Sequence, residues 1–165
     1  MRNLIRGFIA LAFSGAVAAP ALAGIADTPL PKLVLDVSTQ HLYSVPDVVN
    51  TATLGTYFSC TSTSSSSMWV SVELFDGTGT VANSANLDEF HLGAGASVRF
   101  GTGFALGITT GAFLSGSVFS TGSARIVATS KSLICSVFVA DRTNNPPAII
   151  YPLTIIAKTK QKAAN

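Results

Sequence analysis

Residues 133–139 read Leu-Ile-Cys-Ser-Val-Phe-Val, and residues 54–60 read Leu-Gly-Thr-Tyr-Phe-Ser-Cys. In both stretches apolar residues recur at every second position, and each stretch contains one cysteine. Alternation with period 2 is typical of a β-strand that packs one face on a core and turns the other toward solvent. These stretches therefore predict two strands whose inward faces carry Cys60 and Cys135.

The same alternation recurs along most of the chain, with little sign of a helical period. It predicts further strands at residues 33–37, 70–74, 98–100, 124–128 and 148–157. Turn-forming residues separate them, as in Asp76-Gly77-Thr78-Gly79, where glycine allows the positive φ of a tight hairpin. Short strands separated by turns favour an all-β fold, and we expect a two-layer antiparallel β-sandwich over residues 24–157. Pro152 cannot donate to a ladder, so the last strand is expected at an edge or with a bulge.

The first 23 residues have the pattern of an export signal. Arg2 and Arg6 form a basic start, residues 7–17 are an apolar run, and Ala21-Leu22-Ala23 places small residues where a signal peptidase cleaves. The alternative is a buried N-terminal helix, but the run is uniformly apolar rather than amphipathic. It is also shorter than the ~20 residues that span a bilayer. We expect cleavage after Ala23, a secreted or periplasmic protein, and no membrane-spanning segment in the mature chain.

The composition suits a single domain with an uncharged surface. Of all 165 residues, 48% are hydrophobic and only 11% are charged. Loss of Arg2 and Arg6 with the signal reduces the ten basic residues to eight, which balance the eight acidic ones. Weak charge repulsion favours self-association. The basic residues at 158–165 are expected to form a flexible, solvated tail, and no basic patch with interleaved aromatic residues indicates nucleic acid as a partner.

The cysteines predict a covalent link. In an exported protein, two cysteines on inward strand faces most simply form one disulfide, and we expect it to run across the core. Cys60 and Cys135 are 75 residues apart, and closing such a loop is worth about 4 kcal/mol in chain-entropy models. Two buried free thiols are the alternative. No Cys-x-x-Cys motif indicates redox chemistry, and no further ligands have the spacing of a zinc site.

Two stretches depart from the alternating pattern. Residues 61–67 are all serine or threonine, and we expect a solvated loop there, with an O-glycosylated or sugar-contacting loop as the alternative. Residues 101–124 carry no charge and include Leu106 and Ile108 among many Gly, Ser and Thr. One interpretation is a buried strand pair with a loop. The other is an exposed apolar loop or edge strand that uses Leu106 and Ile108 to contact a partner.

The sequence contains no recognisable catalytic motif. His41 and His91 are the two histidines, and no serine lies in the Gly-x-Ser-x-Gly elbow of serine hydrolases. The acidic residues lack the spacing of a calcium loop, and no glycine-rich phosphate loop opens a helix. We therefore expect no catalytic residues, no metal and no cofactor. Trp69 and Tyr57 are instead candidates for stacking on a sugar ring, with interior packing of Trp69 as the alternative.

Three segments carry a resemblance to a known family. Residues 70–79 read Val-Ser-Val-Glu-Leu-Phe-Asp-Gly-Thr-Gly, residues 92–100 read Leu-Gly-Ala-Gly-Ala-Ser-Val-Arg-Phe, and residues 122–126 read Gly-Ser-Ala-Arg-Ile. They resemble bacterial exported immunoglobulin-like sandwich modules, in which a Phe-Asp-x-x-Gly hairpin precedes a Leu-x-x-Gly-x-Ser strand. The resemblance implies a sandwich on the cell exterior with a structural or adhesive role, and no catalytic residues. The chain departs from true immunoglobulin domains at Leu133, where their tyrosine corner places Tyr.

Three functional hypotheses follow, in order of preference. The first is an exported, non-enzymatic structural or interaction module that binds a protein partner or a second copy through residues 101–124. The second is a carbohydrate-binding module that contacts a glycan through Trp69 and a tyrosine. The third is a hydrolase with His41 or His91 as its base.

Overall fold

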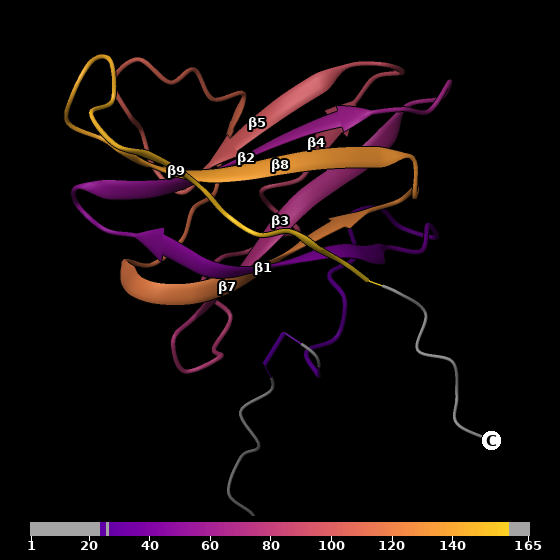
Figure 1. The fold of residues 1–165 in the computed structure, drawn as a ribbon. Coiled ribbons are helices and arrows are strands. Elements are labelled where there is room, and N and C mark those ends of the chain that lie inside the picture. The colour runs from indigo at the N-terminus through magenta and orange to yellow at the C-terminus, as the bar shows by residue number, and fades with distance from the viewer. Residues whose placement is uncertain (1–23, 26, 159–165) are drawn as a thin grey trace, which may run out of the picture.

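The computed structural model of the chain describes residues 24–25 and 27–158 (Figure 1). These residues form ten β-strands and no helix, so the predicted all-β class is confirmed. The predicted export signal and residues 159–165 of the tail lie outside the described residues. The strands are β1 (Gln40–Asn50), β2 (Leu54–Ser62), β3 (Met68–Asp76), β4 (Phe90–Leu92), β5 (Ser97–Gly101), β6 (Ala112–Phe113), β7 (Phe119–Ala128), β8 (Leu133–Asp141), β9 (Ile150–Pro152) and β10 (Ile156–Ala157).

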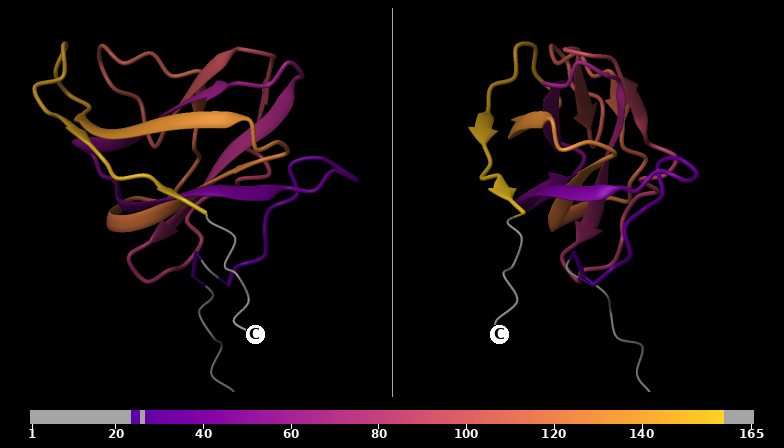
Figure 2. Two further views of the ribbon diagram at one scale, coloured as in Figure 1. Left: turned by 45° about the vertical axis from the view of Figure 1, so that its right-hand side comes forward. Right: turned by 90° about the vertical axis from the view of Figure 1, so that its right-hand side faces the viewer.

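All ten strands belong to one sheet, which bends into two facing halves (Figure 1). The first half has the order β4-β3-β7-β1, and the second has β8-β2-β5-β6 with β9 beside β8. The halves are joined at the corner between β1 and β2, where Asn50 pairs with Gly55. After β9 the chain crosses back to the first half, where β10 pairs with β1 (Figure 2). The sheet is therefore nearly closed and barrel-like around a shared core.

The core lies between the two halves and is built from the inward positions of the alternating pattern. Val72 of β3, Ile126 of β7 and Phe58 of β2 are fully buried there. Burying such a side chain contributes ~1.5–3 kcal/mol, so the shared core holds the halves together. Its buried members are Val45, Val48, Phe58, Cys60, Met68, Val70, Val72, Leu74, Leu92, Val98, Phe100, Leu114, Phe119, Ala124, Ile126, Ala128, Leu133 and Val137.

Strand β1 was not among the predicted strands, although it pairs with β7 along most of its length. Pro46 lies in its middle, and Asp47 has a left-handed φ of 60°. The register against β7 shifts between Pro46 and Val48, which marks a β-bulge. Because of the bulge, Val45 and Val48 both face the core although they are three residues apart. A bulged strand breaks period 2, which is the signal by which the other strands are recognised.

The predicted strand at residues 33–37 is wrong. These residues form bends and turns that precede β1, and Asp36 has a left-handed φ of 61°. Leu33 is buried, whereas Leu35 is 82% exposed. The alternating apolar residues here are one buried side chain, Leu33, and one solvent-exposed side chain, Leu35, and they do not form strand hydrogen bonds. At residues 61–67 the expected loop is shorter than predicted, because β2 continues through Ser62.

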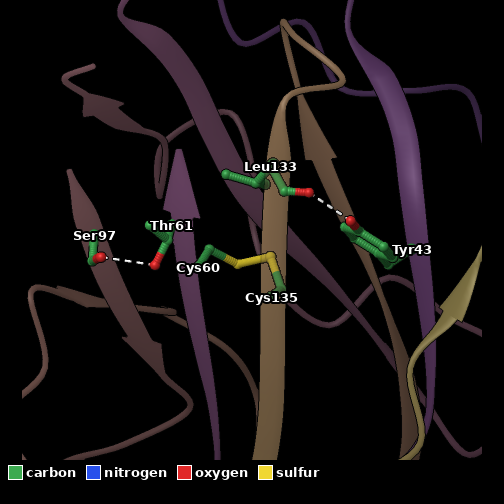
Figure 3. The surroundings of a disulfide bond; sticks show 6 residues. All are labelled: Tyr43, Cys60, Thr61, Ser97, Leu133 and Cys135. Atoms are coloured by element: carbon green, nitrogen blue, oxygen red, sulfur yellow. Dashed lines mark hydrogen bonds between the residues drawn. A yellow bond between two sulfur atoms is a disulfide. The ribbon is translucent and has the colours of Figure 1, made fainter. Parts of the chain in front are cut away.

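The disulfide between Cys60 and Cys135 is present, but the expectation that it crosses the core is wrong (Figure 3). Strands β2 and β8 are neighbours in the same half of the sheet, and the two cysteines are direct cross-strand partners. Their Cα atoms are 4.1 Å apart. The two halves are instead joined near the disulfide by Tyr43, because its hydroxyl on β1 donates a hydrogen bond of 2.5 Å to the Leu133 carbonyl on β8 (Figure 3).

Candidate functional site

Residues 101–118 place an apolar surface segment beside β5. The chain turns at Ala105–Ile108 and then forms β6, which pairs in parallel with β5. Phe104, Leu106 and Phe113 are 63%, 44% and 50% exposed, and the Phe104 and Phe113 rings lie 6.5 Å apart. An open hollow of about 400 Å³, named here the apolar hollow, is lined by Phe104, Ala105, Gly107, Ile108, Thr109, Thr110 and Phe113. Of the two predicted contact residues, Ile108 lines this hollow half-buried and Leu106 lies exposed at the turn.

Arg142 fixes the start of this segment. Its Nε donates to the Phe104 carbonyl at 3.0 Å, and its Nη1 donates to the Thr51 carbonyl at 2.6 Å. A side chain at Gly103 would collide with the guanidinium, because an added Cβ would lie 2.0 Å from Nη2. One cation therefore ties the segment to the β1–β2 corner, which reduces the ordering cost of binding a partner there.

A second, smaller core supports the hollow from below. Tyr57, Ala105 and Ala140 are buried in it, with Ile108 and Phe138 packed against them. The Tyr57 and Phe138 rings stack at 5.5 Å, and the Tyr57 hydroxyl has no hydrogen-bond partner among the described residues. Burial raises the pKa of Tyr57. Tyr57 is thus a supporting residue without exposed surface, and the structure does not bring it together with Trp69.

Trp69 lies on β3, in the other half of the sheet. Its ring packs on His91 of β4, with the ring centres 4.9 Å apart and the planes inclined by 44°. Trp69 is partly exposed and His91 is exposed. This pair forms a small aromatic surface on β3 and β4, and neither of its residues lines the apolar hollow.

His41 has neighbours that do not suit a catalytic base. Its Nε2 donates to the Tyr43 carbonyl at 3.1 Å and lies 3.0 Å from the Ser44 Oγ. Burial lowers the pKa of His41, and the positive charges of Lys158 and Arg125 lower it further. A triad histidine needs a carboxylate that orients it and stabilises its charged form. The two charged groups that act on His41, Lys158 and Arg125, are both cations. Because Nε2 donates its proton to the Tyr43 carbonyl, Nε2 cannot also accept a proton from the Ser44 hydroxyl.

The structure contains a buried ion pair that the sequence pattern does not predict. Arg125 of β7 is 2% exposed, and its Nε donates to the Glu73 carboxylate on β3. Its Nη atoms donate to main-chain carbonyls of the N-terminal segment, at Thr28 (2.8 Å) and Pro29 (2.7 Å). Burial raises the pKa of Glu73, and Arg125 opposes that shift. Both residues stood on the outward positions of the alternating pattern, so the sequence offered no signal that an irregular segment covers them.

The described residues give no sign of a metal site, because no three His, Cys, Asp or Glu side chains converge within them. Nor does that part of the chain contain a helix of the length and apolar character needed to cross a membrane. The chain matches no protein-family model, and neither the curated proteins nor the solved structures gave a match.

Proposed function

We propose that this protein is an exported, non-enzymatic structural module, as its resemblance to bacterial exported immunoglobulin-like sandwiches implies, and that it self-associates through the apolar hollow. The observation that carries the proposal is the pair of exposed phenylalanines, Phe104 and Phe113, at an open hollow in a segment without charge. Contiguous exposed apolar surface on a small soluble domain typically marks an interaction site. The disulfide supports export, because such bonds persist in oxidising compartments.

The partner that suits this surface is a second copy of the chain. Residues 101–124 are uncharged, so they offer a charged partner no complementary group. Two copies present the same uncharged segment to each other, since the neighbouring Arg99 and Arg142 donate to its Thr109 and Phe104 carbonyls. The balance of eight acidic and eight basic residues after Ala23 leaves little long-range repulsion between the copies. Contact between identical patches gives a closed two-fold dimer.

Lysine substitutions at the hollow test this proposal. Phe104→Lys and Phe113→Lys are each expected to weaken dimerisation about tenfold or more, because burying a phenylalanine is worth ~1.5–3 kcal/mol. Leu106→Lys is expected to act in the same direction. Sedimentation equilibrium over a range of protein concentrations gives the dissociation constants. Leu87→Lys is the matched control, since Leu87 is 75% exposed and lies outside the hollow. A wild-type protein that stays monomeric at its highest soluble concentration would contradict the proposal.

Carbohydrate binding at Trp69 is a second candidate, favoured by the partly exposed Trp69 ring beside His91. If this surface binds a glycan, Trp69→Ala should abolish the binding of wild-type protein to a glycan array, because the ring supplies the stacking surface. Phe104→Ala, at the hollow, should leave that binding unchanged. Equal array signals from wild type and Trp69→Ala would exclude this function.

A further inference from the structure

The C-terminal ribbon, residues 150–158, closes the sheet by bridging its two halves (Figure 2). Its first part, β9, pairs with β8 through Ile150, Tyr151 and Pro152. Its last part, β10, pairs with β1 through Ile156 and Ala157. Directly after β9, the Leu153 amide donates to the Val137 carbonyl at 2.9 Å. Directly after β10, the Lys158 amide donates to the Leu42 carbonyl at 2.8 Å. The ribbon is thus the element that spans from β8 to β1.

The ribbon is anchored by two side chains. Leu153 and Ile155 are partly buried and pack against the main core. Ile150, Tyr151 and Ile156 face outward and are 62%, 65% and 54% exposed. By contrast, β2 pairs with β8 along its whole length from Leu54 to Ser62. The ribbon therefore has far fewer ladder contacts and less buried surface than the strands that it joins.

We propose that the ribbon is an exchangeable closing strand, and that a second copy of this chain can insert its own ribbon between β8 and β1. An inserted ribbon would make the same main-chain hydrogen bonds and place the same Leu153 and Ile155 on the core. Residues 143–157 carry no charge, and Lys158 forms no ion pair within the part of the chain that the structure describes, so no such pair ties the ribbon to its own domain. Reciprocal exchange of an identical element is a low-cost route to a dimer, and adding a strand to open sheet edges supplies its affinity.

Asp141, at the end of β8, holds the turn through which the ribbon must open. Its carboxylate accepts main-chain N–H groups of Asn144, Ile149, Ala148 and Thr143. These hydrogen bonds, that of Asn144 first, lower the pKa of Asp141 to about 2. Asp141→Asn weakens these charge-assisted bonds and is therefore expected to promote exchange.

Cysteine pairs on the full chain test the exchange. Val139 and Tyr151 are cross-strand partners, so Val139→Cys/Tyr151→Cys gives a link within one chain in the closed form and between chains after exchange. Phe113→Lys is included in every variant, so that association through the hollow is weakened and the two proposals can fail separately. Oxidation is followed by mass spectrometry of the cross-linked peptides. The ratio of interchain to intrachain links is expected to rise about tenfold per tenfold increase in concentration while monomer predominates, and to rise further with Asp141→Asn.

A second pair and a peptide complete the test. Trp69→Cys/His91→Cys joins β3 and β4, which lie outside the ribbon, so its link should stay within one chain at every concentration.

A labelled peptide of residues 148–158 should be captured by the wild-type chain, whereas the same peptide with Leu153→Asp and Ile155→Asp should not. Intrachain links alone at all concentrations would overturn the proposal. If the 139–151 pair does not oxidise, the peptide decides, and equal capture of the two peptides overturns the proposal as well.

Discussion

Replacement of both Cys60 and Cys135 by alanine is expected to lower the free energy of unfolding by about 4 kcal/mol while the sheet still forms. The bond closes a loop of 75 residues, and chain-entropy models assign about this value to such a loop. The sheet survives because β2 and β8 remain paired from Leu54 to Ser62 without the sulfur link. The loss is large against the ~5–15 kcal/mol net stability of a typical domain, so the double variant should unfold at a much lower urea concentration.

Urea titrations of the variant and of the wild type, with and without a reductant, measure this effect. Reduced wild type should match the alanine variant in its midpoint, and the reductant should leave the variant unchanged. Far-ultraviolet circular dichroism in buffer checks that both keep their strands. A difference below about 1 kcal/mol between oxidised and reduced protein would mean that the unfolded chain gains little freedom when the link is cut, contrary to the loop-closure account.

Period 2 predicted the strands that pack one regular face on the core. Residues 54–60, 70–74 and 133–139 lie within β2, β3 and β8, because a regular strand sends every second side chain inward. The longest strand, β1, escaped prediction because Pro46 and the bulge at Asp47 shift its inward positions. Local alternation also says nothing about which strands become neighbours. The pairing of Cys60 with Cys135 inside one half of the sheet could therefore not be distinguished from a link across the core.

The candidate site was predictable only as a segment. The absence of charge from residues 101–124 marked it, but its shape depends on Arg142, which lies beyond that segment and binds the carbonyls of Phe104 and Thr51. Every residue has a main-chain carbonyl, so the sequence does not show which carbonyls an arginine will bind. Neither the Arg142 contacts nor the burial of Arg125 under the N-terminal segment could therefore be predicted from residue types. Tyr57 shows the same limit, because its burial follows from the segment that covers the outer face of β2.

Arg125→Ala is expected to lower the free energy of unfolding by about 3–5 kcal/mol, the usual cost of breaking a buried ion pair from one side. The variant leaves the Glu73 carboxylate, which is 5% exposed, without its partner. It also removes the Arg125 hydrogen bonds to the carbonyls of Thr28 and Pro29, so the attachment of the N-terminal segment to β7 is weakened. Urea denaturation gives the energy, and hydrogen exchange of the amides in residues 27–33 reports on the attachment.

A double-variant cycle separates the two contributions. Arg125→Met alone leaves a buried carboxylate unpaired, whereas Glu73→Met/Arg125→Met removes both charges and keeps apolar volume at the site. Replacing a whole buried pair by apolar groups is often close to neutral, so the double variant should recover most of the stability lost by the single one. Amides in residues 27–33 should nevertheless exchange faster in both variants, because neither offers donors to the Thr28 and Pro29 carbonyls. If the double variant is as unstable as Arg125→Met, the unpaired Glu73 carboxylate does not account for the lost free energy of unfolding. The loss then comes from the hydrogen bonds to the Thr28 and Pro29 carbonyls, and the chief role of Arg125 is to hold the N-terminal segment on the sheet.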